Sequence, residues 1–203
     1  VERLRKHYQE SLPVMREQFL VGVIEGRIPQ SRLEAQAPLF DIDLSGGPWA
    51  VALVHAVAGP GEGSAASLNG EEELIPFSLK YTVEEILGKY CKFVDFLYSD
   101  CVTVIVPLAE GEEILPLING MNEICKTAER ALGVKISAGI STVCSNLVDI
   151  RHSYREAQNA LDYSAVQGSS KAIYIADVEH EPAVKVHFDE HDEREITNAI
   201  KLG

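Results

Sequence analysis

Apolar residues recur every three or four positions through the first 26 residues, a spacing that predicts one amphipathic helix. The stripe consists of Leu4, Tyr8, Leu12, Met15, Phe19 and Val23. Pro13 lies inside this stretch, so we expect a kink or a fresh start of the helix near Ser11. Gly26 fits the end of the helix.

The same stripe supports two interpretations. It packs against its own domain, or it is the seam of a homodimer. Four of its residues alternate in steps of four, three and four, as coiled-coil positions do: Tyr8, Leu12, Met15 and Phe19. Two heptads are fewer than a coiled-coil assignment needs, and both interpretations remain open.

Strand-like and helix-like patterns alternate in the rest of the chain. Ser31 and Glu34 have capping-box spacing and predict a helix from Ser31 to about residue 40. Thr82 and Glu85 have the same spacing and predict the start of another helix. The near-continuous apolar run over residues 49–58 predicts a strand buried on both faces. Further helices are expected over 114–132 and 146–166, and further strands over 134–141 and 171–175.

A β-hairpin is expected between residues 91 and 107. An aromatic and β-branched run enters over 91–97, a polar tip follows over 98–101, and a β-branched run leaves over 102–106 and stops at Pro107. A hairpin within an alternating pattern favours an α/β (α+β) fold with a mixed sheet and helices packed on it. The arrangement is the ferredoxin-like one, preceded by an N-terminal helical linker.

Composition and charge narrow the classes of function. The 203 residues carry a formal charge of −13, which argues against a nucleic-acid surface on this chain. No apolar run is long enough for a membrane helix, and no signal peptide is recognisable at the N-terminus, so we expect a cytoplasmic protein. Because the first residue is Val1, we expect a piece of a longer chain. The acidic tail beyond residue 177 predicts a solvated segment, and the spacing of its histidines matches no zinc pattern.

The four cysteines form no C-x-x-C pair, so we expect reduced thiols that behave as small apolar residues. They are Cys91, Cys101, Cys125 and Cys144. His55 lies in the apolar strand and is expected to be a core or edge histidine. Cys101, Asp100 and His55 could form a nucleophile set only if the fold brings them within hydrogen-bonding distance.

Three segments stand out in the second half of the chain: Val134-Lys-Ile-Ser-Ala-Gly-Ile-Ser141, the helix from Asp149 to Leu161, and Ala172-Ile-Tyr-Ile175. Together they resemble the C-terminal half of GGDEF-type domains. The nearest resemblance is to the degenerate GGDEF-like domain between the receiver and the AraC-type DNA-binding domain of YesN-like response regulators. The resemblance implies a nucleotide-cyclase-like fold over 46–178. It also implies a helical linker over 1–45 and an acidic tail over 179–203 that leads to a DNA-binding domain outside this chain.

The hairpin tip departs from the family pattern. An active diguanylate cyclase carries Gly-Gly-Asp/Glu-Glu-Phe there, because glycine lets the backbone approach the nucleotide and the acids hold a divalent metal. The matching residues here are Tyr98, Ser99, Asp100, Cys101 and Val102, which retain one acid and neither glycine. The family's metal-binding Asp on the first strand also has no counterpart near His55.

These departures predict a protein that is not an enzyme and needs no metal or cofactor. The resemblance implies a signal-transmission module of a cytoplasmic two-component response regulator. Its partners would be the receiver and AraC-type DNA-binding domains of the same polypeptide and a second copy of the chain, with no direct contact to nucleic acid or membrane. The alternative is a sensor that binds a nucleotide or small effector, without turnover, in a cleft at His55 and Asp100.

Overall fold

The computed structural model describes residues 2–45, 47–57, 72–109, 111–168 and 170–179. The helices are α1 (Glu2–Ile24), α2 (Gln30–Gln36), α3 (Ile75–Leu87), α4 (Leu115–Leu132), α5 (Ile150–Gln167) and α6 (Ile175–Glu179). The strands are β1 (Trp49–Val57), β2 (Val94–Tyr98), β3 (Cys101–Pro107), β4 (Lys135–Ile140) and β5 (Ala172–Tyr174). No helix in the described part of the chain is both long and apolar enough to cross a membrane.

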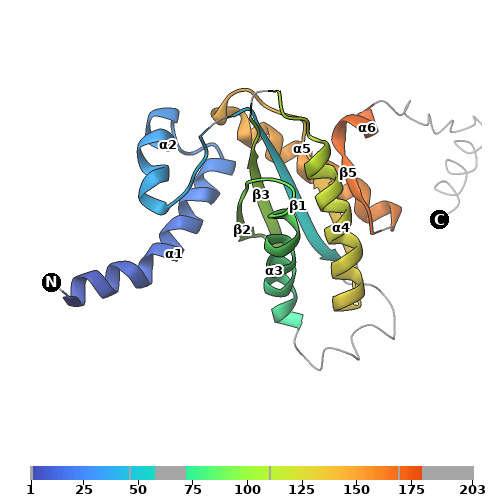
Figure 1. Ribbon diagram of the computed structural model, residues 1–203, viewed down its shortest axis with the longest axis horizontal. Coiled ribbons are helices and arrows are strands. Elements are labelled where there is room, and N and C mark those ends of the chain that lie inside the picture. The colour runs from blue at the N-terminus through green and yellow to red at the C-terminus, as the bar shows by residue number, and fades with distance from the viewer. Residues whose placement is uncertain (1, 46, 58–71, 110, 169, 180–203) are drawn as a thin grey trace, which may run out of the picture.

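One five-stranded sheet, in the order β2-β3-β1-β4-β5, organises the molecule (Figure 1). All neighbouring strands are antiparallel except β4 and β5, which are parallel. The predicted mixed sheet with packed helices is therefore confirmed. β1 lies at the centre, and the apolar run in its sequence is explained because helices cover both faces of the sheet.

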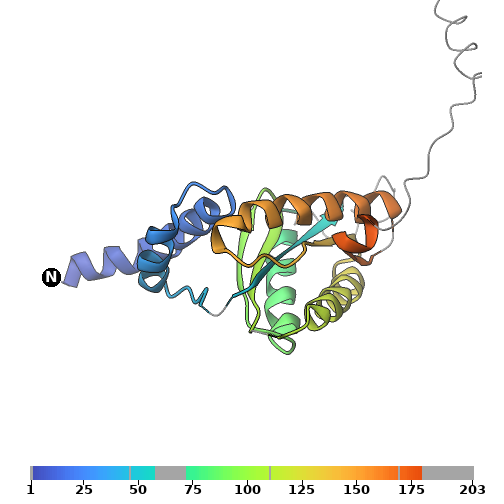
Figure 2. The same cartoon turned by 90° about the horizontal axis from the view of Figure 1, so that it is seen from above.

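Two hydrophobic clusters lie on the two faces of the sheet. On one face α3 and α4 pack on alternate residues of β1 and β3, among them Val54 and Val104. On the other face α5 and the C-terminal part of α1 pack on the remaining residues, among them Leu53 and Ile105. Figure 2 shows the sheet between these layers, with α5 on one side and α3 and α4 on the other.

The N-terminal helical segment shares the second cluster. Phe19, Leu20, Val23 and Ile24 of α1 are buried there together with Leu33 of α2. The core therefore runs across the predicted boundary between residues 45 and 46. Farther from the sheet, α1 extends away from the body of the protein (Figure 1).

Two predictions about helix caps are wrong, and one of the two alternatives at Pro13 is excluded. α1 passes through Pro13 as one helix, so it does not start afresh near Ser11. α2 begins at Gln30 after Pro29, and its N-cap residue makes no side-chain hydrogen bond, so Ser31 does not cap it. Thr82 does not begin α3 either, because α3 begins at Ile75.

Thr82 lies in the middle of α3, seven residues after its start at Ile75. Its hydroxyl donates to the carbonyl of Ser78 over 2.9 Å, a bond to the preceding turn that a threonine inside a helix commonly makes. Pro76 occupies the first turn, where proline is well tolerated because its missing N–H has no partner there. The proline, rather than the threonine, marks where this helix begins.

An ion pair connects α3 to β2, one of the two edge strands of the sheet. The Lys80 ammonium lies 2.8 Å from the buried carboxylate of Asp95 on β2 and also contacts Glu84. Burial by itself lowers the pKa of Lys80, but the two carboxylates outweigh it and the net pKa is raised. From the other side, the Arg16 guanidinium of α1 donates to the Asp95 carbonyl over 3.3 Å. Asp95 therefore contacts both α1 and α3.

Candidate functional site

The tip of the β2–β3 hairpin is a two-residue turn formed by Ser99 and Asp100. Tyr98 and Cys101 form the last pair of the ladder, so the predicted four-residue tip is two residues shorter. Ser99 and Asp100 both have positive φ, 49° and 60°, as a type I′ turn requires. Both side chains are exposed.

Tyr98 attaches this turn to α5 and to Glu25, the residue directly after α1. Its hydroxyl donates to Glu25 Oε1 over 2.8 Å, and its ring centroid lies 6.2 Å from that of Tyr154. The hydrogen bond raises the pKa of Tyr98 and lowers that of Glu25. Arg27 forms an ion pair with the same carboxylate. The position that the sequence resemblance would match to a glycine thus carries an aromatic ring that contacts α5 and the residue after α1.

Cys101 and His55 are neighbours by register on the α5 side of the sheet. Val54 pairs with Val102 in the β1–β3 ladder, so one step further His55 falls opposite Cys101. Burial raises the pKa of the Cys101 thiol to about 11, with Asp100 adding to the effect. A thiol with that pKa is almost entirely protonated at neutral pH and is a poor nucleophile.

The residues at this turn do not fit a metal-bound triphosphate. Asp100 supplies the one carboxylate of the turn, and the neighbouring donors are a protonated thiol and an imidazole, whereas Mg²⁺ prefers several hard oxygen ligands. Among the described residues, no three His, Cys, Asp or Glu side chains are grouped closely enough to hold a metal ion.

A pocket of about 920 Å³ lies at the opposite end of β2 and β3. It is bounded by the loop between α3 and β2, the residues after β3, the start of α4 and the segment after α2. Its charged lining consists of Arg16, Asp41, Asp43, Lys89, Lys92, Glu112 and Glu113. Neither His55 nor Asp100, the residues of the predicted effector cleft, lines it.

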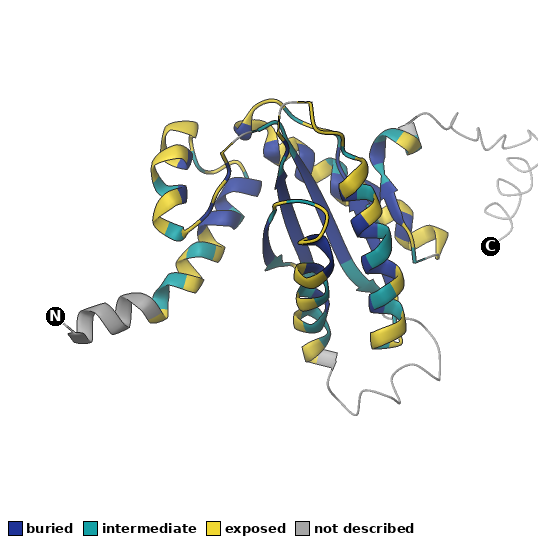
Figure 3. Ribbon diagram, viewed as in Figure 1, coloured by how far each residue is buried: buried dark blue, intermediate teal, exposed yellow. Residues whose placement is uncertain are grey.

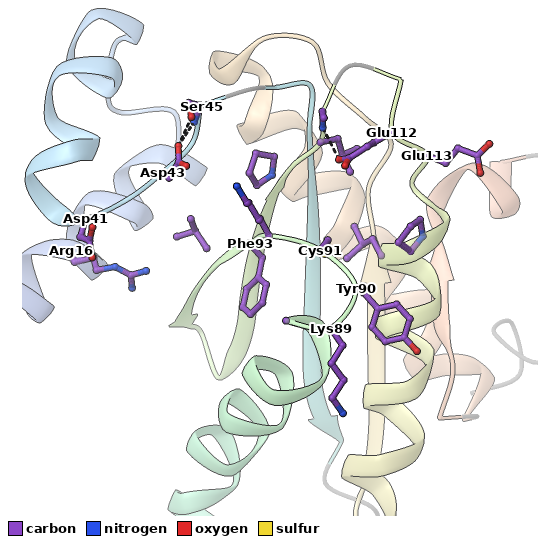
Figure 4. Close-up of a pocket in the computed structure, with 18 residues that line it drawn as sticks. Arg16, Asp41, Asp43, Ser45, Lys89, Tyr90, Cys91, Phe93, Glu112 and Glu113 are labelled. Carbon is purple, nitrogen blue, oxygen red and sulfur yellow. Dashed lines mark hydrogen bonds between the residues drawn. The ribbon is translucent and has the colours of Figure 1, made fainter.

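Some of the pocket's carboxylates are already engaged within the protein. Asp43 accepts hydrogen bonds from Ser45, which lower the pKa of Asp43, and Glu112 accepts one from the Ala109 amide over 2.7 Å. Figure 4 shows the Arg16 side chain extending from α1 toward the pocket. Because Arg16 also bonds to β2, the pocket borders the contact between α1 and the sheet.

The four residues of the predicted dimer seam lie in different surroundings. Phe19 is buried and its ring centroid lies 5.1 Å from that of Phe40, inside the protein's own core. Leu12 is half-buried, and Met15 is 42% exposed. Tyr8 lies in the part of α1 whose side chains the structure does not describe. The solvent-facing part of the stripe therefore includes Met15 but not Phe19.

Sequence reasoning missed Glu25, Tyr154, Lys89 and Lys92. Tyr154 lies in the helix predicted over 146–166, but nothing local indicated that it faces Tyr98. Glu25 is 73 positions from Tyr98, and no periodic pattern connects residues so far apart. The two lysines follow the C-terminal end of α3 at Leu87, which the sequence pattern did not locate. Locating that end could have drawn attention to the loop that carries them.

Solved structures of GGDEF domains are similar to this chain in fold. The coiled coil and GGDEF domain of DgcB from Caulobacter crescentus, solved in complex with c-di-GMP, is 14% identical. It has a TM-score of 0.52 over 86% of this chain and 93% of that one. The active GGEEF domain of a diguanylate cyclase from Vibrio cholerae is 11% identical, with a TM-score of 0.46 over 71% of this chain and 90% of that one.

No curated protein matches the sequence. At these identities the solved structures support the fold alone. The family assignment comes from the sequence itself, which matches the GGDEF-like domain over residues 25–163, well over half of the chain. The protein therefore belongs to the family of GGDEF-like domains.

Proposed function

We propose that this chain is a non-enzymatic signal-transmission module of a cytoplasmic two-component response regulator. It would connect a receiver domain to an AraC-type DNA-binding domain, both outside this chain, and would act as a homodimer through α1. The supporting observation is the bond from Tyr98 to Glu25, the residue directly after α1, which ties the hairpin to the C-terminal end of the helix that would lead from the receiver.

The contact favours transmission over catalysis for a steric and an electrostatic reason. An aromatic side chain stands where a cyclase needs a bare backbone for close approach to the nucleotide. Asp100 is the one acid of the turn, and a single carboxylate is a weak site for a divalent metal. The negative charge that develops on the phosphates during cyclisation would therefore lack a metal ion to compensate it. A movement of α1 would instead act on the hairpin through Glu25, directly after the helix, and Tyr98. At the other end of β2 it would act through Arg16 of α1 itself.

The proposal is tested by incubating the protein with GTP and Mg²⁺ and separating the products by chromatography, with the variant Asp100→Ala alongside. We expect no cyclic dinucleotide from either protein. Turnover by the wild type that Asp100→Ala abolishes would refute the non-enzymatic assignment. Transmission itself is tested in a full-length regulator, where Tyr98→Phe should weaken the dependence of DNA binding on receiver phosphorylation. An unchanged dependence would count against the role of this contact.

A second candidate function is an effector sensor without turnover, and the pocket beside Arg16 favours it. A thermal-shift screen with GTP, cyclic dinucleotides and Mg²⁺ tests it, because a ligand at 100 times its Kd stabilises by about 2.7 kcal/mol. Lys92→Ala should remove a shift caused by binding in this pocket, whereas His55→Ala should remove one caused by binding in the predicted cleft. No shift with any compound favours the pure connector.

A further inference from the structure

The outer face of α3 carries a row of large apolar side chains that nothing in the described structure covers. Leu74, Phe77 and Tyr81 are 52%, 62% and 60% exposed. Leu74 ends the short 3-10 helix Glu72–Leu74 and is the N-cap residue of α3. The spacing of three and four residues places Phe77 and Tyr81 of α3 on the same side as Leu74. We call these three residues the α3 stripe. The opposite side of the helix is buried against the sheet through Leu79, Val83, Ile86 and Leu87. The exposed turns of α3 are visible in Figure 3.

Single exposed apolar residues are ordinary, but a contiguous row of three is more informative. Since one such side chain presents roughly 150–250 Å² when free, the stripe exposes on the order of 300–400 Å². That is the size of the largest, often functional, patch on a typical monomer. The Tyr81 hydroxyl donates to Glu85 Oε1 over 2.9 Å, which holds the ring along the helix.

The charges around the stripe are predominantly negative. Glu73, Glu84 and Glu85 are all exposed next to it. The positive charge beside it, on Lys80, is already compensated by Glu84 and by Asp95 on β2. A partner that covers the stripe must therefore bring positive charge of its own.

A second copy of this chain is a poor occupant. It would bring a further formal charge of −13 and place the same glutamates opposite one another. The stripe also offers less than half of the about 800 Å² that each partner buries in a stable interface. A short helix fits the area, because one apolar ridge packs between the side chains of a single facing helix.

We propose that the α3 stripe docks a basic amphipathic helix of another protein segment. The apolar ridge of that helix lies over Phe77 and Tyr81, and its lysines or arginines face Glu73, Glu84 and Glu85. The docking surface is on the opposite face of the sheet from α1, and it does not depend on the proposed function.

The experiment uses a fluorescent 14-residue leucine–lysine peptide that forms an amphipathic helix, with fluorescence anisotropy as the readout at physiological salt. The test variant is Phe77→Ser with Tyr81→Ser, both at exposed positions. The matched control is Tyr163→Ser with Val166→Ser, which removes two exposed apolar side chains from one face of α5. Circular dichroism establishes that both variants are folded.

We expect the test variant to bind the peptide roughly 30-fold more weakly than the wild type, since two aromatic anchors are lost, and the control to bind it unchanged. A leucine–glutamate peptide of the same pattern should not bind. Equal loss in both variants, no loss in the test variant, or equal binding of the acidic peptide would each overturn the proposal. The proposal would also be overturned if sedimentation showed that the wild-type protein self-associates and that the α3 stripe substitutions abolish this self-association. The occupant of the stripe would then be a second copy of the chain.

Discussion

Replacing Gly139 by alanine is expected to separate α5 from the sheet and to destabilise the fold severely. Gly139 lies in β4, within the segment 134–141 that resembles GGDEF-type domains in sequence. A Cβ atom there would lie 2.2 Å from the Ala157 carbonyl oxygen and 2.3 Å from the Leu161 amide nitrogen. Both neighbours are backbone atoms of α5, so no rotation of a side chain relieves the clash.

The magnitude follows from the movement required. Ordinary contacts of a Cβ atom begin at 3.4 Å, so α5 must move away by about 1 Å, and a gap of that size forfeits about a quarter to a half of each dispersion contact that α5 makes. Overpacking of a core costs about 1–3 kcal/mol when side chains can adjust, and here they cannot. We therefore expect a loss of at least about 3 kcal/mol, out of a total stability of about 5–15 kcal/mol.

Urea unfolding followed by circular dichroism measures this loss. With a slope of about 2 kcal/mol per molar urea, the midpoint of Gly139→Ala should fall by about 1.5 M or more. Gly88→Ala is the matched control, because Gly88 has ordinary helical φ and its added Cβ would lie 3.1 Å from the Glu84 carbonyl oxygen. A midpoint for Gly139→Ala within the range of the Gly88 control would refute the close approach of α5 to β4.

Four further outcomes are expected. Tyr98→Phe should lower the urea midpoint at neutral pH. Because the bond to Glu25 lowers the pKa of Glu25 and raises that of Tyr98, the difference from wild type should shrink at acidic pH, as Glu25 protonates below its ordinary pKa of 4.5. It should also shrink at alkaline pH, as Tyr98 ionises above its ordinary pKa of 10.0. Ser99→Gly should raise the urea midpoint, because glycine adopts the positive φ of the turn without the penalty of about 1 kcal/mol that a side chain brings; a lower midpoint would contradict the turn geometry. Lys80→Met should cost about 2–4 kcal/mol in urea unfolding by leaving a buried carboxylate unpaired, and a neutral effect would exclude the ion pair. Met15→Glu should convert a dimer to a monomer in light scattering, and a wild type that is already monomeric at high concentration would remove the seam from consideration.

The elements that could be predicted from sequence are those specified by long, regular patterns. The apolar run of β1 is long enough to identify a strand covered on both faces, and the 3.6-residue period of α4 and α5 fixes each helix and its buried side. Both helices end at a glycine in the left-handed conformation, Gly133 and Gly168. Such patterns involve many residues at once, so tertiary contacts reinforce them.

What could not be predicted depends on single residues or on distant pairs. Thr82 and Glu85 satisfy a four-residue capping pattern that occurs inside α3 as readily as at its start. At the candidate site, the loss of glycine at Tyr98 was readable, but the bond from Tyr98 to Glu25 depends on how two distant segments fold together. The pocket was unpredictable for the same reason, since its lining comes from four separate parts of the chain.

The bond from Arg16 to the Asp95 carbonyl bears on where this domain can be cut. β2 is the last strand of the sheet, and its outer side presents backbone groups that no sixth strand pairs in the described fold. α1 lies beside that side, and the Arg16 guanidinium occupies one of its carbonyls. A version of the protein trimmed to the family match, which begins at Glu25, would lose this cover together with Phe19 and Leu20. Its open strand would be free to recruit the same strand of another molecule, so aggregation rather than a stable minimal domain is the consequence of that truncation.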